Sequence, residues 1–364
     1  MGHPCGRGEP MNRAWRAAGG GLLLVLATGA GAAPDALPRK AAANESYPGV
    51  VVQYDTLRNA AGERLRLIVT RPQHLDGKVA VIFVAGWLSC DTVEAPAGTT
   101  GAAQRVFRAL AQLPGFATVR LEKAGVGDSE GDCGASDFSA ELAAYRQAFR
   151  SLGSYPFVDT TRVFVFGLSN GGGFAPLVAE AAPVRGYVVV GGWIKTWFEH
   201  MLEIERRRLA LAGVPAAELD AQMKDVAQLY AGYLLQQETP RGIFARQPRL
   251  QRLWEGDAGQ QYGRPVRYYQ QLQELDLMRA WSQVHAPLLV LHGEFDWIMS
   301  RADLETMAAL VNANAPGAAQ FAELPLTGHT LEHYASLEAA FAGKQGPFED
   351  AIAQRIAAWF EAQR

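Results

Sequence analysis

The sequence predicts an α/β protein in which a mostly parallel, eight-stranded sheet is covered by helices on both faces. The first observation is that strand-like runs such as 79–84 and 163–166 are uninterrupted apolar stretches. Such runs are expected of strands that are buried on both faces of a sheet. The second is that helical segments alternate with these runs, as βαβ crossovers require. The third is size, because 364 residues, 49% of them hydrophobic, can form a large core.

The predicted strands begin with a β-hairpin. Two strand-like runs flank Asn59-Ala-Ala-Gly62, which has the composition of a turn. The predicted strands cover residues 50–57, 65–70, 79–84, 117–121, 163–166, 186–190, 287–291 and 321–324.

The predicted helices lie between these strands. Asp137 is the expected N-cap of one helix, because its carboxylate can accept a hydrogen bond from a free backbone N–H group of the first turn. The predicted helices cover residues 104–113, 137–152, segments that begin near 174 and at 303, and 352–360.

Residues 194–283 differ from the rest of the chain because they contain no strand-like run. Apolar residues recur there at helical spacing, namely Leu219, Met223, Val226, Tyr230, Tyr233 and Leu234. We therefore predict a helical insertion, residues 194–283, in a core domain formed by residues 48–193 and 284–364. The insertion is rich in aromatic residues, most of which fit its own core. These residues are Trp197, Phe198, Tyr230, Tyr233, Trp254, Tyr268 and Tyr269.

The N-terminal region has the pattern of a secretory signal. Arg13 and Arg16 precede the apolar run 19–27, and the small residues 30–33 follow it. The expected division is a signal peptide at 1–33, cut near Ala32 or Ala33, then a flexible leader at 34–47. The apolar run is too short to cross a bilayer, so no stable membrane insertion is expected. We predict a secreted or periplasmic protein; the alternative is a cytosolic protein with a Gly/Ala-rich tail.

The composition and the motifs of the chain limit which partners and cofactors are expected. A net charge of −3 and a pI near 6.2 give no reason to expect nucleic acid. The sequence has no H-E-x-x-H and no P-loop motif, so no metal or nucleotide cofactor is predicted.

The stretch Gly167-Leu168-Ser169-Asn170-Gly171 joins a buried strand to an apolar, helical segment. This is the G-x-S-x-G pattern of a nucleophile elbow. A serine in so tight a turn needs residues without side chains two positions before and after it. We therefore predict that Ser169 is the nucleophile.

Two later loops supply the groups that a serine nucleophile needs. Asp296 follows the strand at 287–291 and is the predicted acid, and Glu294 is the alternative. His329 follows the last strand and is the predicted base. The imidazole must take the serine proton, and the carboxylate must orient the imidazole. Two other histidines are expected to be structural, His292 at a strand end and His333 in a following helix.

At this point the chain resembles the α/β-hydrolase superfamily, and within it lid-bearing bacterial serine hydrolases similar to serine aminopeptidases and lipase-like esterases. The resemblance covers about residues 48 to 364 and rests on four motifs: Gly167-Leu-Ser-Asn-Gly171, His292-Gly-Glu-Phe-Asp296, Gly328-His329 and Gly125-Val-Gly-Asp-Ser129.

The resemblance implies that the insertion at 194–283 is the family's helical lid, whose aromatic residues would suit an apolar or aromatic acyl group. It also implies that the backbone N–H groups of Trp87 and Asn170 form an oxyanion hole. The chain departs from the family pattern at two positions. Ala85 replaces the histidine of a His-Gly pair, and Ala124 replaces an arginine before G-x-G.

The predicted function is a secreted serine hydrolase that cleaves a carboxylic ester, a thioester or a small amide through an acyl-enzyme. The expected partner is therefore a small-molecule acyl substrate. One alternative is an aminopeptidase on short peptides, in which Glu199, Glu203 and Glu205 could bind the free amine. These residues could equally form a solvated helix face. The other alternative is a catalytically silent binding protein with the same fold.

The last prediction is a disulfide between Cys90 and Cys133. In the α/β-hydrolase strand order, the strands that precede these two cysteines are neighbours, so their loops leave the same end of the sheet. Export would supply an oxidising compartment, and the mature chain would hold no other cysteine. Two separate buried thiols are the alternative.

Overall fold

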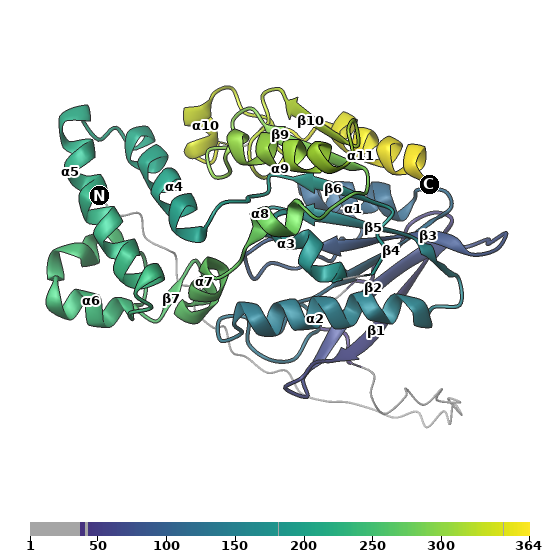
Figure 1. Cartoon of the computed structure of the whole chain (residues 1–364). Coiled ribbons are helices and arrows are strands. Elements are labelled where there is room, and N and C mark those ends of the chain that lie inside the picture. Colours follow the sequence, from purple (N-terminus) through teal and green to yellow (C-terminus); the bar gives the residue numbers. More distant parts are fainter. Residues whose placement is uncertain (1–36, 41–42, 181, 345) are drawn as a thin grey trace, which may run out of the picture. The chain divides into compact units, whose positions relative to one another are not determined.

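A computed structural model describes residues 37–40, 43–180, 182–344 and 346–364. Its centre is an eight-stranded sheet in the order β1-β2-β4-β3-β5-β6-β9-β10 (Figure 1). Strand β2 is antiparallel to both of its neighbours, and the other pairs are parallel. The strands are β1 Val50–Arg58, β2 Arg64–Pro72, β3 Val79–Ala85, β4 Phe116–Leu121, β5 Val158–Leu168, β6 Gly186–Val190, β9 Leu288–Gly293 and β10 Ala319–Leu324. The predicted fold class is confirmed.

Helices cover both faces of this sheet (Figure 1). Helices α1 and α11 pack together on one face, and α2, α3 and α9 lie on the other. The helices of this core are α1 Ala102–Ala111, α2 Phe138–Arg150, α3 Asn170–Ala179, α9 Arg301–Asn314, α10 Leu337–Phe341 and α11 Asp350–Gln363, with a short 3-10 helix η1 at Ser151–Ser154. Asp137 caps α2 as predicted, and its carboxylate accepts a hydrogen bond from the backbone N–H of Ala140.

The central strands divide their side chains between two hydrophobic cores. In β3, Val81 and Phe83 join the core under α2 and α3, whereas Ile82 and Val84 join the core under α1 and α11. Side chains alternate between the two faces of a strand, so a strand covered on both sides must be apolar throughout. This explains the uninterrupted apolar runs in the sequence.

The segment between β6 and β9 is mainly helical, as predicted. Its elements are α4 Trp197–Leu211, α5 Ala216–Tyr230, the π-helical turn η2 Ala231–Leu235, α6 Pro240–Arg246, the 3-10 helix η3 Pro248–Leu253, the strands β7 Gln260–Gln261 and β8 Arg264–Pro265, α7 Val266–Gln273 and α8 Leu277–Trp281. We call residues 194–283 the helical insertion.

The helical insertion differs from the prediction in two details. It contains the small hairpin of β7 and β8, which is too short to produce an alternating pattern in the sequence. Its last helix packs on the core domain, since the Trp281 indole N–H donates to the carbonyl of Gly173 at 2.9 Å. The insertion and the core domain therefore share side-chain packing near residue 281.

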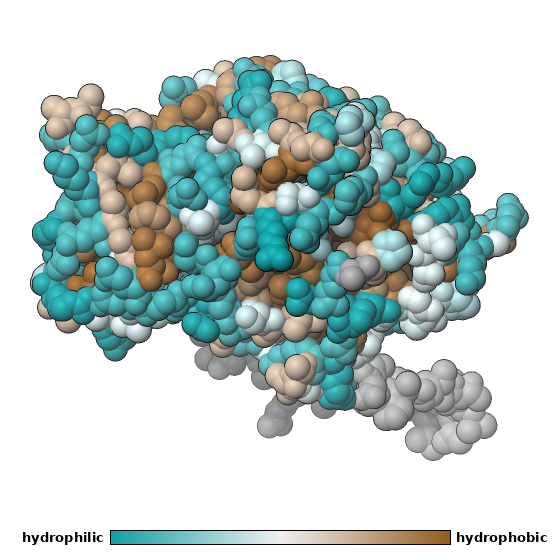
Figure 2. Space-filling model, viewed as in Figure 1, coloured by the Kyte–Doolittle hydropathy of each residue, from teal (hydrophilic) through white to brown (hydrophobic). Residues whose placement is uncertain are grey.

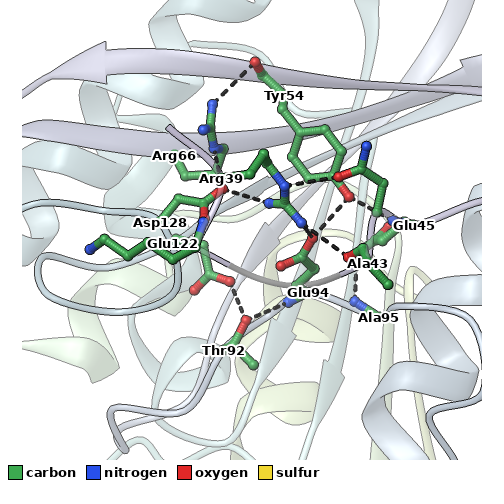
Figure 3. Close-up of polar contacts among 12 residues, drawn as sticks. Arg39, Ala43, Glu45, Tyr54, Arg66, Thr92, Glu94, Ala95, Glu122 and Asp128 are labelled. Carbon is green, nitrogen blue, oxygen red and sulfur yellow. Dashed lines mark hydrogen bonds and ion pairs between the residues drawn. The ribbon is translucent and has the colours of Figure 1, made fainter. Parts of the chain in front are cut away.

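The predicted flexible leader is instead a strap that packs against the sheet and its loops. We define the strap as residues 37–47, of which 41 and 42 are not described. Glu45 is buried and forms an ion pair with the buried Arg120 of β4 at 2.6 Å. Arg39 lies among Glu94, Asp128 and the Tyr54 ring (Figure 3). Because its charged side chains have buried partners in later parts of the chain, the strap is anchored, and this part of the prediction is wrong.

The predicted signal peptide at 1–33 lies outside the described residues. Within the described part of the chain, no helix is both long and apolar enough to cross a membrane. The face seen in Figure 2 is mixed, with a strip of hydrophobic residues over the helical insertion and further hydrophobic residues between hydrophilic ones near its middle.

Candidate active site

Ser169 lies in the sharp turn between β5 and α3. Its backbone has a φ of 54° and a ψ of −122°, a conformation that costs a residue with a side chain about 1–3 kcal/mol. A Cβ on Gly167 would lie 2.7 Å from the Cα of Gly172, and a Cβ on Gly171 would clash with the carbonyl of Ala85. Only glycine fits at both positions, so strand and helix can approach closely enough to expose the Ser169 hydroxyl.

His329 lies in the loop after β10, and its ring lies between Ser169 and Asp296. Its Nε2 is 2.9 Å from the Ser169 hydroxyl, and its Nδ1 is 2.8 Å from Asp296 Oδ2. With the Nδ1 proton donated to the carboxylate, Nε2 is free to accept the serine proton. The structure therefore brings together the three residues that the sequence singled out, although they are 160 and 33 positions apart.

Asp296 is fixed by its own loop after β9. Its Oδ1 accepts hydrogen bonds from the backbone N–H groups of Ile298 and Met299, both at 2.9 Å. Burial raises the pKa of Asp296, but the contact with His329 and these backbone bonds outweigh burial and lower it. Burial likewise lowers the pKa of His329, and the Asp296 carboxylate more than offsets this and raises it. Each partner thus stabilises the charged form of the other.

The alternative residues play structural parts. Glu294 is exposed, and its carboxylate accepts a hydrogen bond from the backbone N–H of Leu326 at 2.7 Å, in the turn before His329. His292 is buried with its Nε2 3.4 Å from the carbonyl of Met299. His333 pairs with Thr327 in a β-bridge and contacts Glu349 at 3.2 Å, so it does not lie in the predicted helix.

Trp87 and Asn170 both line the cavity in front of Ser169. The Asn170 side chain is held at both ends, because it accepts from the Trp193 indole at 2.9 Å and donates to the Tyr268 hydroxyl at 3.0 Å. This fixes the Asn170 side chain in the first turn of α3, where the backbone N–H groups of a helix have no partner within the helix and carry partial positive charge.

A buried lysine that the sequence reasoning missed holds the loop that carries Trp87. The Lys123 ammonium donates to the backbone carbonyls of Trp87 and Ser89. On the other side of Trp87, the Gly86 N–H donates to the Tyr145 hydroxyl at 3.1 Å. Burial lowers the pKa of Lys123 to about 8. No sequence pattern reveals this role, because the hydrogen-bond partners of Lys123 are backbone carbonyls; its ammonium also lies 3.9 Å from the Glu141 carboxylate.

The predicted disulfide between Cys90 and Cys133 is present, with an S–S distance of 2.04 Å. It joins the loop after β3 to the loop after β4, and these strands are parallel neighbours. The buried Arg264 of β8 packs on it with Nη1 2.5 Å from Cys133 Sγ, and also forms an ion pair with Glu141. The disulfide thus lies between the loop after Trp87 and the helical insertion.

A cavity of about 850 Å³ opens in front of Ser169 and His329, between the core domain and the helical insertion. Of the insertion aromatics named from the sequence, Trp197 lines the cavity, whereas Tyr230, Tyr233, Tyr268 and Tyr269 are fully buried core residues. Tyr262, at the tip of the β7–β8 hairpin, also lines it and was missed. A cavity of this volume is of the size that encloses a small-molecule ligand.

The three glutamates considered as amine ligands all have partners. Glu199 forms the capping box of α4 with Thr196. Glu203 pairs with Lys195 and Arg207, and Glu205 pairs with Arg208 at 2.7 Å. Among the described residues, no group of three histidine, cysteine, aspartate or glutamate side chains could hold a metal ion.

Comparison with solved structures supports the fold assignment. Est1E from Butyrivibrio proteoclasticus, solved with ferulic acid, is 14% identical, with a TM-score of 0.54 over 85% of this chain and 98% of that one. A Pyrococcus furiosus esterase is 12% identical, with a TM-score of 0.52 over 90% and 96%. A hypothetical protein from Pseudomonas aeruginosa is 15% identical, with a TM-score of 0.52 over 87% and 95%. At these identities the likeness concerns the fold alone.

Comparison of sequences gives the family. No curated protein matches the sequence significantly. Residues 97–332 match the family model described as serine aminopeptidase, S33, and this stretch contains Ser169, Asp296 and His329. The chain therefore belongs to this α/β-hydrolase family.

Proposed function

We propose that this protein is a serine hydrolase that cleaves carboxylic esters through an acyl-enzyme, with Ser169 as nucleophile, His329 as base and Asp296 as the residue that orients His329. The observation that carries the proposal is the continuous chain of hydrogen bonds from Ser169 through His329 to Asp296. Thioesters and small amides are within the same chemistry.

In the proposed reaction, His329 Nε2 takes the hydroxyl proton while Ser169 Oγ bonds to the substrate carbonyl carbon. The carbonyl oxygen becomes an oxyanion, which the N–H groups of Trp87 and Asn170 would stabilise. The carbon–oxygen bond to the alcohol then breaks, and the alcohol leaves with the proton from His329. A water molecule repeats the sequence on the acyl-enzyme, which frees the acid and returns the proton to Ser169.

Ester hydrolysis is favoured over aminopeptidase activity by the state of the insertion glutamates. An aminopeptidase needs a carboxylate close to the nucleophile that is free to bind the substrate amine. Glu199, Glu203 and Glu205 are instead engaged in a helix cap and in ion pairs. The description of the family model keeps peptidase activity as the second candidate.

We also propose that the protein is exported. The pattern of residues 13–33 supports this, and a disulfide is typical of proteins in oxidising compartments. Fractionation of cells that express the full chain should place the processed protein in the periplasm or medium. Unprocessed protein in the cytosol would contradict export.

The function is tested by covalent labelling and hydrolysis with a Ser169→Ala variant. A fluorophosphonate probe should label the wild-type protein and leave the variant unlabelled, because the probe requires the activated hydroxyl. Hydrolysis of p-nitrophenyl acetate should fall by about 10⁴-fold or more in the variant. Ser129→Ala, which changes the serine of the G-x-G-x-S loop, is the control for labelling. Equal labelling of wild type and Ser169→Ala would overturn the assignment.

The choice between ester and peptide is tested with paired substrates. Purified wild-type protein should hydrolyse p-nitrophenyl esters with a higher kcat/KM than aminoacyl anilides of matched acyl groups. The reverse order would establish the aminopeptidase instead.

A further inference from the structure

One face of helix α4 lines the cavity from the catalytic end to the far end. Figure 1 shows α4 entering the helical insertion directly from the segment after β6. Its cavity-lining residues repeat at helical spacing and are Trp197, His200, Met201, Ile204, Glu205 and Arg208. With a rise of 1.5 Å per residue, the face from Trp197 to Arg208 is about 16 Å long. This cavity wall is much longer than an acetyl group.

The chemistry of this face changes along its length. Near Ser169 the wall is aromatic and uncharged, because burial lowers the pKa of His200 to about 3 and keeps the ring neutral. His200 lies 4.7 Å from the Trp197 ring, between centroids. Met201 and Ile204 follow as an apolar middle section. The far end is charged and begins at Glu205 and Arg208.

Four residues form the far end, which we call the distal cluster: Glu205, Arg208, Glu255 and Tyr262. Each of them lines the cavity, and the charges of the first three act on one another. Glu205 is 3% exposed, and burial raises its pKa despite the ion pair with Arg208 at 2.7 Å. Glu255 is exposed and adds a second carboxylate. The cluster thus carries two carboxylates for one guanidinium.

Negative charge also predominates in the rest of the cavity wall. Asp91 and Glu332 also line it, so the described lining residues include four carboxylates and one guanidinium. A cavity lined by one sign of charge attracts the opposite charge and repels its own, more strongly where water is excluded. A substrate that ends in a carboxylate is therefore disfavoured, whereas a positive charge is favoured.

We propose that the cavity binds an elongated ester whose acyl chain runs along α4 and ends in a cationic nitrogen held by the distal cluster. The apolar middle section accommodates the hydrocarbon chain, and Glu255, next to the Glu205–Arg208 pair, stabilises the cation. The Tyr262 ring can add a cation–π contact. This inference rests on the proposed function, because it assigns a substrate class to the same nucleophile.

The test compares three p-nitrophenyl esters with acyl chains of equal length, which end in a trimethylammonium, a methyl or a carboxylate group. The quaternary ammonium cannot attack its own ester, whereas the terminal carboxylate can, so the rate without enzyme is measured for each ester and subtracted. The wild-type kcat/KM should follow that order, with the cationic chain at least about tenfold above the anionic one. In a series of cationic chains from butanoyl to dodecanoyl, kcat/KM should rise with length. An anionic chain that is preferred, or no dependence on end group, would overturn the proposal.

Variants locate the effect in the distal cluster. Glu255→Gln, at an exposed position, should lower the cation-to-anion ratio several-fold. The matched control is Glu218→Gln, an exposed acid on α5 outside the cavity, which should leave the ratio unchanged. An unchanged ratio in Glu255→Gln would also overturn the proposal.

Hydrolysis of p-nitrophenyl acetate distinguishes a failure of the proposed function from a failure of the proposed substrate class. The control Glu218→Gln should hydrolyse p-nitrophenyl acetate like the wild type, because its position on α5 lies outside the cavity. If wild-type protein cleaves no ester at all, the proposed function fails. If it cleaves the acetate but shows no preference between end groups, only the substrate class fails.

Discussion

Two acidic residues of one loop, Asp296 and Glu294, have different tasks because of where their carboxylates point. Asp296 is buried and bonded to His329, whereas Glu294 is exposed and bonded to the backbone of Leu326. The pKa of His329 lies above its usual 6.5 even though burial lowers it, because Asp296 raises it by a larger amount. In the proposed mechanism the neutral form of His329 is active, so activity should rise with pH through this raised pKa.

Replacing Asp296 by Asn should therefore change both the rate and the pH profile. The variant loses the carboxylate that raises the His329 pKa, whereas burial remains, so the midpoint of kcat/KM against pH should move down. The rate at the plateau should fall by about 10⁴-fold, because the amide also favours the wrong tautomer. Glu294→Gln is the control and should lose less than about tenfold. Rates from pH 5 to 9 decide it, and a larger loss in Glu294→Gln would transfer the orienting role to that residue.

Sequence order was enough to single out the residues that meet at the candidate site, but not the residues that hold them. Ser169, Asp296 and His329 each follow a predicted strand, and parallel strands end at one edge of a sheet. Lys123 and Glu45 bind partners that are remote in sequence, and their contacts depend on how two loops and a strap pack. No local pattern encodes such contacts, so Lys123 was missed and Glu45 was assigned to a flexible leader.

At the scale of single elements, the loop after β3 is fixed from several sides. The Tyr145 hydroxyl on α2 binds Gly86, Lys123 binds the carbonyls of Trp87 and Ser89, and the disulfide holds Cys90. In the proposed mechanism the Trp87 N–H must already point at the oxyanion when it forms. A rigid loop provides this without reorganisation during the reaction.

Lys123→Met should weaken catalysis more than substrate binding. The variant leaves two backbone carbonyls without a donor, so the Trp87 peptide can shift, and kcat should fall about 100-fold with a small change in KM. The affinity for a trifluoromethyl ketone, which forms an oxyanion on the serine, should fall in parallel. Thermal unfolding and fluorophosphonate titration are the controls for folding. A loss confined to stability, with kcat retained, would show that Lys123 has no part in positioning.

Element boundaries were predicted well where apolar runs were long, and less well where packing overrides local preference. Helix α3 begins at Asn170 rather than near 174. Gly171, Gly172 and Gly173 are poor helix formers, but a Cβ on any of them would clash with β3, β6 or Trp193. Close packing of the helix against its neighbours therefore selects glycine and forms the helix. The β7–β8 hairpin, with two residues in each strand, lies below what alternation can reveal.

At the scale of the whole molecule, the strap connects the start of the described chain to the loops around the candidate site. Glu45 also accepts a hydrogen bond from the Ala95 N–H, and the Tyr47 hydroxyl donates to the Ala95 carbonyl at 2.8 Å. Residue 95 lies shortly after the loop of Trp87 and Cys90. Packing of the strap therefore supports the same region as Lys123, from the opposite side of β4.

Glu45→Gln should destabilise the protein strongly. The change leaves the Arg120 guanidinium, which is 1% exposed, without its counter-charge, and the loss of one partner of a buried pair costs about 3–5 kcal/mol. The matched control is Glu305→Gln, which removes the exposed pair with Arg301 on α9 and should cost at most about 1 kcal/mol. Denaturant unfolding of the two variants measures the difference. Equal stabilities would show that the strap contributes little to the fold.

The strap also sets an order in which the chain can fold as it is synthesised. Arg39 pairs with Asp128, which lies 89 positions later, and Glu45 with Arg120, which lies 75 positions later. In a nascent chain that ends before Asp128, the charged residues of the strap lack these partners. The strap therefore has no ion pairs that would hold it against the sheet. Closure waits until about the first third of the polypeptide has emerged and β4 can join the sheet. A chain that crosses a membrane N-terminus first would thus cross in an unfolded, extended form. The strap would pack only after its later partners have reached the far side of the membrane.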